Sequence, residues 1–437
     1  MQNSLQTDTF INRHFHLLFF VGFALGLLLS FMYANHQILT NDQTQMIDKG
    51  YKAAHQGIWS SHGNVASSVG NVPGYLSTAV IALPLMIWDS PWSPMGFIIL
   101  LHVLAFVLMD SIIKEQFDQR IRLLFLVLFW LNPWFLFENR FYNPSFLFLF
   151  AALHFWSAYH MREKRSFVYT FLHLLSIGMS MQLHYSWPIL AVISSYLFYR
   201  GIIKVHWLGF ISAAIVIIVS LIPYLQEYLS NDAIKARPDK AGDERYIGWG
   251  GVHVYPVVKA FIYWFRYASF LFTNKLVLGA SFEWISSVEL VQKAAMYLYR
   301  TIFFTAGAIS LWFVWKANRY TWGLLKPYIL RRSGFELSSK QWILLYLFGV
   351  LLAIFISASL SPIVFVHWHL LLTFIFALLP LLFYAQQQIE QENRSITKPL
   401  IIIATYLIFI NIVASHDSER FSYKADFQQQ TLKRIGQ

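Results

Sequence analysis

An acidic residue stands just beyond the first long apolar stretch of the chain. Asp42 follows the stretch 15–33, within the polar sequence Asn41-Asp42-Gln43. If this stretch crosses a membrane, the carboxylate lies at the level of the lipid headgroups. There it can accept a proton from a hydroxyl while the reacting bond stays shielded from bulk water. Asp is also an ordinary N-cap for a helix, here over 43–56. The residue type alone leaves both roles open.

A guanidinium group occupies a similar place further along the chain. Arg140 lies in the sequence Glu-Asn-Arg-Phe-Tyr-Asn-Pro at 138–144, between two later apolar stretches. Guanidinium groups make paired hydrogen bonds to phosphate oxygens. Arg140 could equally pair with Glu138 or extend its charge to the lipid surface. Phosphate contact and a local role therefore both remain open, and Asn143 is a polar candidate for lining the same cavity.

Histidines and a basic loop complete the set of candidates. His184 lies in Gln-Leu-His-Tyr-Ser at 182–186, where polar groups can line a cavity or cap helix ends. Arg245 lies in a charged segment followed by glycines, which suits a loop that closes over a phosphate headgroup or an ordinary solvated loop. His369 could face a phosphate. With His367 two positions away, it does not by itself make a metal site.

Membrane-spanning helices must position these residues. Of the 437 residues, 57% are hydrophobic and only 13% are charged, whereas a soluble protein has about a quarter charged residues. The apolar stretches of about 17–21 residues match a bilayer core of about 30 Å. The sequence predicts a single all-α membrane domain over 1–437, a bundle of about 11–13 spanning helices. Hydropathy places eleven of them at roughly 15–33, 95–113, 121–137, 145–161, 167–181, 187–203, 205–225, 298–315, 341–359, 365–384 and 398–413.

The basic residues predict an orientation for the bundle. Connections within 114–122, 162–165, 200–204, 316–340 and 394–398 hold 16 lysines and arginines, whereas the opposite short connections hold one. Basic connections stay in the cytoplasm. We therefore expect a cytoplasmic N-terminus, an outer C-terminal tail and the candidate residues on the outer face, in a bacterial inner membrane. The net charge of +11 belongs to this topology, and no nucleic-acid partner is expected.

Two outer segments are too long to be simple connectors. They run over 34–93 and 226–297, and loops of this length in a compact fold usually carry function. Each contains an apolar or amphipathic stretch, at 75–88 and 257–272. We expect both stretches to form helices at or near the membrane surface.

The order of these features resembles a known family. Asp42 after the first span, the helix end Gly57-Ile58-Trp59 and the sequence Gly-Asn-Val-Pro-Gly-Tyr at 70–75 resemble the first outer loop of GT-C glycosyltransferases. The likeness is to the bacterial branch near protein O-mannosyltransferases and lipid A aminoarabinose transferases, and the Arg-x-aromatic-Asn-Pro stretch at 140–144 is similar to that branch too. Two departures stand out. Gln43 replaces a frequent Glu, and 71–74 lacks the Lys-Pro-Pro-Leu of the aminoarabinose-type enzymes.

The resemblance implies an inverting transferase that moves a sugar from a polyprenyl phosphate to a lipid, glycan or protein acceptor. In that family the Asp at the position of Asp42 is the proposed catalytic base. Cationic groups would stabilise the departing phosphate, in the order Arg140, Arg245 and His369. The residues expected to line the cavity are Gln43, Tyr75, Asn143, His184 and His367.

A transport function is the alternative for a chain with this many apolar stretches. A multi-span transporter or lipid flippase would have pseudo-symmetric halves and ionisable groups in mid-span. The chain contains no cysteine, which excludes disulfides and thiolate chemistry. There is no Gly-rich nucleotide loop after a strand. We expect no cofactor. A divalent metal is left open, and it would need ligands beyond the two late histidines, such as Asp42.

Overall fold

The computed structural model describes residues 2–35, 40–65, 70–232, 248–249, 252–269, 275–329, 337–361, 365–391, 395–416 and 427–436. These residues are mostly helical, with two short antiparallel strand pairs. The first half of the chain forms α1 (Gln2–Ala34), α2 (Asn41–Gln56), β1 (His62–Val65), β2 (Asn71–Pro73), α3 (Leu76–Ile87), α4 (Trp92–Gln116), α5 (Gln119–Trp130), α6 (Pro133–Phe137), η1 (Asn143–Phe146), α7 (Leu147–Met161), α8 (Phe167–Met181), α9 (Pro188–Tyr199) and α10 (Trp207–Ser230). The second half forms β3 (Gly248–Trp249), β4 (Val252–His253), α12 (Val254–Ser269), α13 (Lys275–Leu278), α14 (Glu289–Ile329), α15 (Ser339–Ser359), η2 (His367–Thr373), α16 (Phe374–Glu390), α17 (Thr397–His416) and α18 (Phe427–Arg434).

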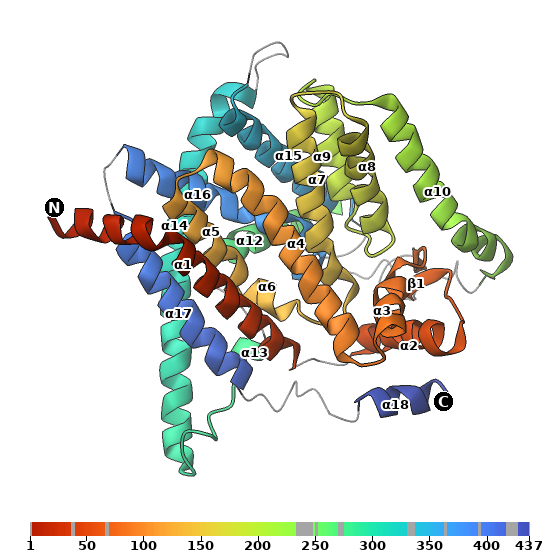
Figure 1. Cartoon of the computed structure of the whole chain (residues 1–437), viewed down its shortest axis with the longest axis horizontal. Helices are drawn as coiled ribbons and strands as arrows, with labels where there is room; N and C mark the ends of the chain where they lie inside the picture. Colours follow the sequence, from red (N-terminus) through yellow and green to blue (C-terminus); the bar gives the residue numbers. More distant parts are fainter. Residues whose placement is uncertain are drawn as a thin grey trace.

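The protein is a multi-pass, all-α membrane protein (Figure 1). Among the described residues, eight helical segments have the length and hydropathy needed to cross a bilayer. Each of the eleven predicted stretches coincides with helix, so the predicted fold class is confirmed. The predicted spans near 145–161, 167–181 and 187–203 correspond to α7, α8 and α9. These have 15, 15 and 12 residues and are shorter than a typical span of about 20.

The helix connections gather at two ends of the bundle. At one end, hydrogen bonds join connections that carry the basic residues: Asp118 N–H to Gln386 Oε1 (3.1 Å), Lys204 Nζ to Glu163 O (2.8 Å), Arg200 Nη1 to Ile329 O (2.8 Å) and Trp342 Nε1 to Ile202 O (2.9 Å). We call this the basic end. At the other end, the Tyr185 hydroxyl donates to Asn71 O (2.8 Å), and the His253 ring bonds to Ser361 O (2.8 Å). We call this the site end.

The two helices predicted after the first span are present at the site end. They are α2 and α3, and they pack against each other beside the β1–β2 pair. Figure 1 shows these elements together at one corner of the molecule, with α18 beside α2. The Arg434 side chain of α18 bonds the Asp48 carboxylate of α2 at 2.6 Å, and Gln56 Nε2 donates to Ile435 O at 3.1 Å. The described part of the C-terminal tail therefore lies on the same side as Asp42.

The amphipathic stretch predicted at 257–272 forms α12. This helix packs against α14, α15, α16 and η2, and it buries Ala260, Trp264, Tyr267 and Ala268. Its neighbour α14 has 41 residues, which at 1.5 Å per residue gives about 60 Å. That length is about twice the bilayer core. The helix α14 must therefore extend well beyond the hydrocarbon layer.

Candidate active site

The helix α2 fixes the position of Asp42. Thr40 is the N-cap, and its backbone N–H donates to Gln43 Oε1 at 3.0 Å, which closes a capping box. Asp42 lies inside the first turn, and the capping role considered for it belongs to Thr40 and Gln43. Gln43 is only 1% exposed, so its amide group supports the start of α2. We had expected it to line the cavity.

The backbone of Asp42 is held from β1, while its carboxyl group is half-buried. Asn64 Nδ2 donates to Asp42 O at 2.6 Å, which joins the start of α2 to the strand pair. Burial raises the pKa of the Asp42 carboxyl, and the charge of Arg140 opposes this shift without cancelling it. A carboxyl with a raised pKa is better matched to take up a proton near neutral pH than an ordinary one.

A short buried segment after α5 positions Arg140. Asn132 caps α6 by accepting from Trp134 N–H (3.0 Å), and it donates to Tyr267 O of α12 (2.9 Å). The segment then turns sharply, and Arg140 N–H donates to Glu138 O at 2.8 Å. The two Asn-Pro pairs, at 132–133 and 143–144, interrupt the flanking helices and allow this turn. Glu138 and Arg140 consequently lie at the site end within the protein.

Arg140 and Glu138 form a two-pronged buried ion pair. Arg140 Nε lies 3.2 Å from Glu138 Oε2, and Nη2 lies 3.1 Å from Oε1. The guanidinium also lies between the rings of Phe137 (4.2 Å) and Tyr142 (4.5 Å). The Arg140 side chain is only 10% exposed and the Glu138 side chain 0%. The pairing alternative considered for Arg140 is therefore present, whereas the alternative of reaching out to lipid is excluded by this burial.

Asp42 and Arg140 share one electrostatic environment, although about 98 positions separate them in the sequence. The charge of Arg140 lowers the pKa of Asp42 against the effect of burial. Burial raises the pKa of Tyr142 as well, where Arg140 opposes the shift and Asp42 adds to it. Tyr142 thus lies within electrostatic range of both charges. The start of α2 and the segment after α6 thus bring a carboxyl group and a guanidinium to the same end of the bundle.

Glu138 is the acidic centre of this cluster. Besides Arg140, it accepts a hydrogen bond from Ser145 Oγ at 2.7 Å, and His367 Nε2 lies 3.6 Å from Oε1. Burial alone would raise its pKa, but Arg140, His367 and Ser145 outweigh burial and lower the pKa to about 2. These partners therefore favour the ionised form of Glu138. The sequence suggests Glu138 only as a partner for Arg140. Its position as a charged residue beside an apolar segment is the feature that could have indicated a larger role.

The helix α12 adds two cations that the sequence did not single out as site residues. The Arg266 guanidinium lies over the rings of Tyr263 (5.0 Å) and Trp134 (5.4 Å), next to the segment that carries Arg140. The Lys259 charge acts on His369. In the sequence, Lys259 and Arg266 are charged residues within an apolar stretch. That feature could have marked them as candidates. The packing of α12 on η2 brings Arg266 to Trp134 and Lys259 within electrostatic range of His369.

The late histidines lie beside these groups. The His367 ring packs on Trp134 at 5.0 Å, and the rings of His184 and His369 stack at 5.5 Å. His369 is engaged within its own turn, because its ring nitrogens lie 3.0 Å from Val366 N and 3.1 Å from Trp368 Nε1. His184 Nδ1 lies 2.9 Å from Ser186 Oγ, and burial lowers the pKa of His184 to about 4.

The remaining predicted residues are more scattered. Asn143 begins η1 and is 4% exposed, and its Oδ1 atom has no hydrogen-bond partner in the part of the chain that the structure describes. Tyr75 precedes α3 at the surface, where its ring lies edge-on to Trp59 at 6.4 Å. Arg245 lies outside the described residues. Within the described part of the chain, no group of three or more His, Asp and Glu side chains is arranged to hold a metal ion.

Comparisons with known proteins give one likeness. No protein-family model matches the sequence, and no curated protein matches it. The structure is similar to the crystal structure of ArnT from Cupriavidus metallidurans in the apo state, with 12% sequence identity and a TM-score of 0.45. The similarity covers 92% of this chain and 77% of that chain. At this distance the likeness assigns neither a family nor a role to any residue.

Proposed function

We propose that this protein is a membrane glycosyltransferase. It transfers a sugar from a polyprenyl phosphate to an envelope acceptor, with inversion at the anomeric carbon. The observation that supports this proposal most is the convergence of Asp42 and Arg140. A half-buried carboxyl with a raised pKa lies within electrostatic range of a guanidinium whose position is fixed by Glu138. This combination supplies a base for an acceptor and a cation for a leaving phosphate.

The proposed reaction consists of one proton transfer, one bond formed and one bond broken. The Asp42 carboxylate takes the proton of an acceptor hydroxyl or amine, and the freed electron pair attacks the anomeric carbon. The bond from that carbon to the phosphate oxygen breaks, and its electrons leave on the polyprenyl phosphate. Negative charge grows on this oxygen in the transition state, so a cation placed there beforehand lowers the barrier. We assign this role to Arg140, and we propose Arg266 and Lys259 of α12 as additional cations.

Glu138 acts as a positioning residue in this scheme. Its two oxygens hold Nε and Nη2 of Arg140, Ser145 donates a hydrogen bond to Glu138 in turn, and His367 Nε2 lies 3.6 Å from it. A guanidinium fixed in this way needs no reorganisation when charge develops on the donor. Arg245 remains a proposed phosphate contact from the second long outer segment. His369 is the weakest member of the predicted set, because both its ring nitrogens already have partners.

We propose further that the site faces the outside of a bacterial inner membrane, with the N-terminus in the cytoplasm. The support is the separation of the two ends of the bundle. The basic connections meet at one end, and Asp42, Arg140 and His367 lie at the other. Basic connections favour the cytoplasm. Cysteine-accessibility labelling of Lys326→Cys in intact cells would contradict this orientation if the residue proved to be outside.

The experiment that tests the function compares the wild-type protein with Asp42→Asn at matched abundance in the membrane. Mass spectrometry of lipid-linked sugars and envelope glycans is expected to show donor accumulation and acceptor loss in the variant. Unchanged glycans in the variant would contradict the assignment of Asp42. The same assay with purified protein in nanodiscs separates an enzyme from a carrier. A transferase forms product there, whereas a transporter has no second compartment to fill.

A further inference from the structure

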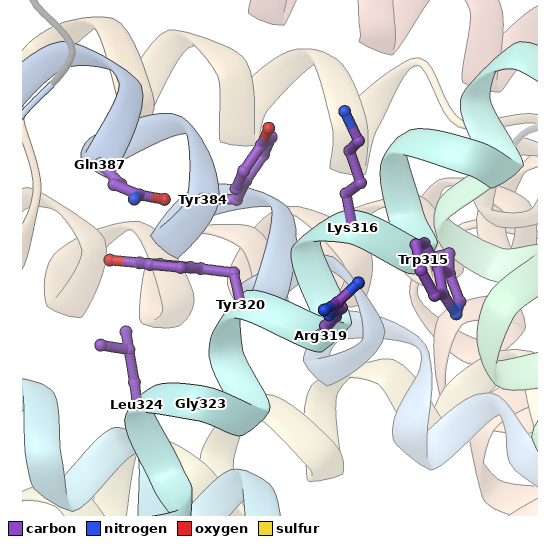
Figure 2. A pocket seen from close by; sticks show the side chains of 8 residues that line it. All are labelled: Trp315, Lys316, Arg319, Tyr320, Gly323, Leu324, Tyr384 and Gln387. Atoms are coloured by element: carbon purple, nitrogen blue, oxygen red, sulfur yellow. The ribbon is translucent and has the colours of Figure 1, made fainter.

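A groove lies between α14 and α16 at the basic end of the bundle, away from the candidate active site. Figure 2 shows the side chains from these two helices that line it. The groove encloses about 480 Å³. Lys316 and Arg319 lie on α14, and Tyr384 and Gln387 lie on α16. None of these residues has a part in the proposed transfer reaction.

The two cations of the groove have aromatic neighbours but no acidic partner. Lys316 Nζ lies 3.6 Å from the centre of the Trp312 ring, and the Arg319 guanidinium lies 5.6 Å from the centre of the Trp315 ring. Neither cation forms an ion pair with a carboxylate in the described part of the chain. Glu390, at the end of α16, instead accepts from Gln386 Nε2 at 2.5 Å and lies 3.7 Å from Lys340 Nζ. Within the described residues, the groove therefore carries two cations that are not bound to a carboxylate.

Gln387 and Gly323 are the other two residues that matter for binding in the groove. The Oε1 atom of Gln387 is buried and has no hydrogen-bond partner among the described residues. A buried acceptor without a partner costs free energy, so a donor from outside the chain would be favourable there. Gly323 leaves the groove open, because a Cβ atom at this position would meet nothing within 4 Å. A headgroup that carries both an anion and a hydroxyl fits these groups.

The depth of the groove matches the lipid headgroup layer. Gln386, next to Gln387, accepts from Asp118 N–H in the α4–α5 connection at the basic end. On α14, Trp312, Trp315 and Trp322 are 51%, 49% and 48% exposed. Exposed tryptophans of this kind mark the interface between the hydrocarbon core and the headgroups. The groove thus opens where phospholipid phosphates are found.

We propose that the groove binds the headgroup of an anionic phospholipid. Lys316 and Arg319 contact the phosphate, Gln387 accepts a hydrogen bond from a headgroup hydroxyl, and the tryptophans border the acyl chains. Each basic group near an anionic membrane surface contributes about 1 kcal/mol. The loss of both cations is therefore expected to weaken binding about 10- to 30-fold.

The test uses phosphatidylglycerol as the probe and the full-length protein. Native mass spectrometry after incubation with equimolar phosphatidylglycerol and phosphatidylcholine is expected to show preferential retention of phosphatidylglycerol. The double variant Lys316→Gln/Arg319→Gln is expected to lose this preference. Lys326→Gln removes an exposed charge from the same helix outside the groove, so it serves as the matched control and is expected to keep the preference.

A second variant tests whether lipid retention depends on the groove itself and not only on the net charge of the helix. Gly323→Trp fills the groove while both cations remain, and it is expected to reduce retention as strongly as the double variant. Thermal unfolding in phosphatidylcholine nanodiscs checks that each variant is folded. Equal retention by the wild type and the double variant would overturn the proposal, as would equal loss in Lys326→Gln. Displacement of the lipid by millimolar inorganic phosphate would show a site for free anions and would also overturn it.

Discussion

Two arginine–carboxylate pairs in this protein have the same chemistry but different surroundings. Arg122 and Asp110 join α5 to α4, with Nε–Oδ1 and Nη2–Oδ2 distances of 2.7 and 2.6 Å. The Arg122 guanidinium lies over Phe19 at 4.5 Å, as Arg140 lies over Phe137 at 4.2 Å. In the Arg140–Glu138 pair the corresponding distances are longer, at 3.2 and 3.1 Å. Glu138 also serves Ser145 and His367, and Arg140 acts on Asp42.

The difference shows what distinguishes a structural pair from one prepared for a ligand. The Arg122–Asp110 pair is complete in itself and fastens two consecutive helices. In the other pair, the carboxylate has several partners and the guanidinium acts on a second acid outside the pair. A shared and slightly longer contact leaves more of the guanidinium charge to act on another anion, whereas a complete pair neutralises its own charges. Substitutions at matched positions in the two pairs test this distinction.

The largest effect is expected for Asp42→Asn. The change removes basicity but keeps size, and the capping box of Thr40 and Gln43 is untouched. Because a positioned base contributes about 10²- to 10⁴-fold, turnover is expected to fall by about that factor while thermal stability stays unchanged. Asp48→Asn on the same helix is the control. It alters only the contact with Arg434 and is expected to leave turnover within about twofold. Near-normal transfer by Asp42→Asn would remove Asp42 from the reaction.

Arg140→Lys is expected to have the next largest effect. Lysine keeps the charge but loses the two-pronged geometry, so transfer is expected to fall about 10- to 100-fold. Arg122→Lys removes the same geometry from the structural pair. It is expected to lower the unfolding temperature and to leave the turnover of the folded protein unchanged. Steady-state kinetics together with thermal unfolding of both variants would measure this. A similar loss of turnover in the two variants would contradict the comparison.

Glu138→Gln is expected to reduce turnover about tenfold, because the guanidinium loses the charged partner that fixes it. Removing one partner of a buried pair typically costs about 3–5 kcal/mol of unfolding free energy. Asp110→Asn should cost a similar amount of stability without the loss of turnover. Chemical unfolding and kinetics on the folded fraction separate the two effects. If Asp110→Asn reduced turnover equally, Glu138 would be a purely structural residue.

The smallest effect concerns pH. Asp42 must be deprotonated to act as a base, so transfer is lost as the pH falls through its raised pKa. Arg140 lowers that pKa against burial. Arg140→Gln is therefore expected to move the acidic limb of the kcat/KM profile to higher pH, by about one unit or less. Arg122→Gln, the matched change in the other pair, should leave the limb in place. An acidic limb that did not move in Arg140→Gln would mean that another group titrates.

The sequence predicted the helices better than their contacts. Apolar stretches mark helices wherever they occur, so the eleven predicted stretches, α2, α3 and α12 could all be located from local pattern. Asp42 and Arg140 could be singled out as candidates because each follows an apolar span, and their roles stay predictions. The role of Glu138 and the positions of Arg266 and Lys259 depend on how α12 packs against α6 and η2, and no local pattern encodes that packing. The capping role of Gln43 was missed because Thr40, not Asp42, begins the helix.

The contact between α18 and α2 has a consequence for biosynthesis. Arg434 and Asp48 are 386 positions apart in the sequence. During translation, the helix that carries Asp42 is therefore made long before the residues that brace it. Those residues must first be synthesised and carried to the same side of the membrane. Until then, α2 relies on earlier elements such as α3 and the β1–β2 pair, so the site end of the molecule is among the last parts to mature.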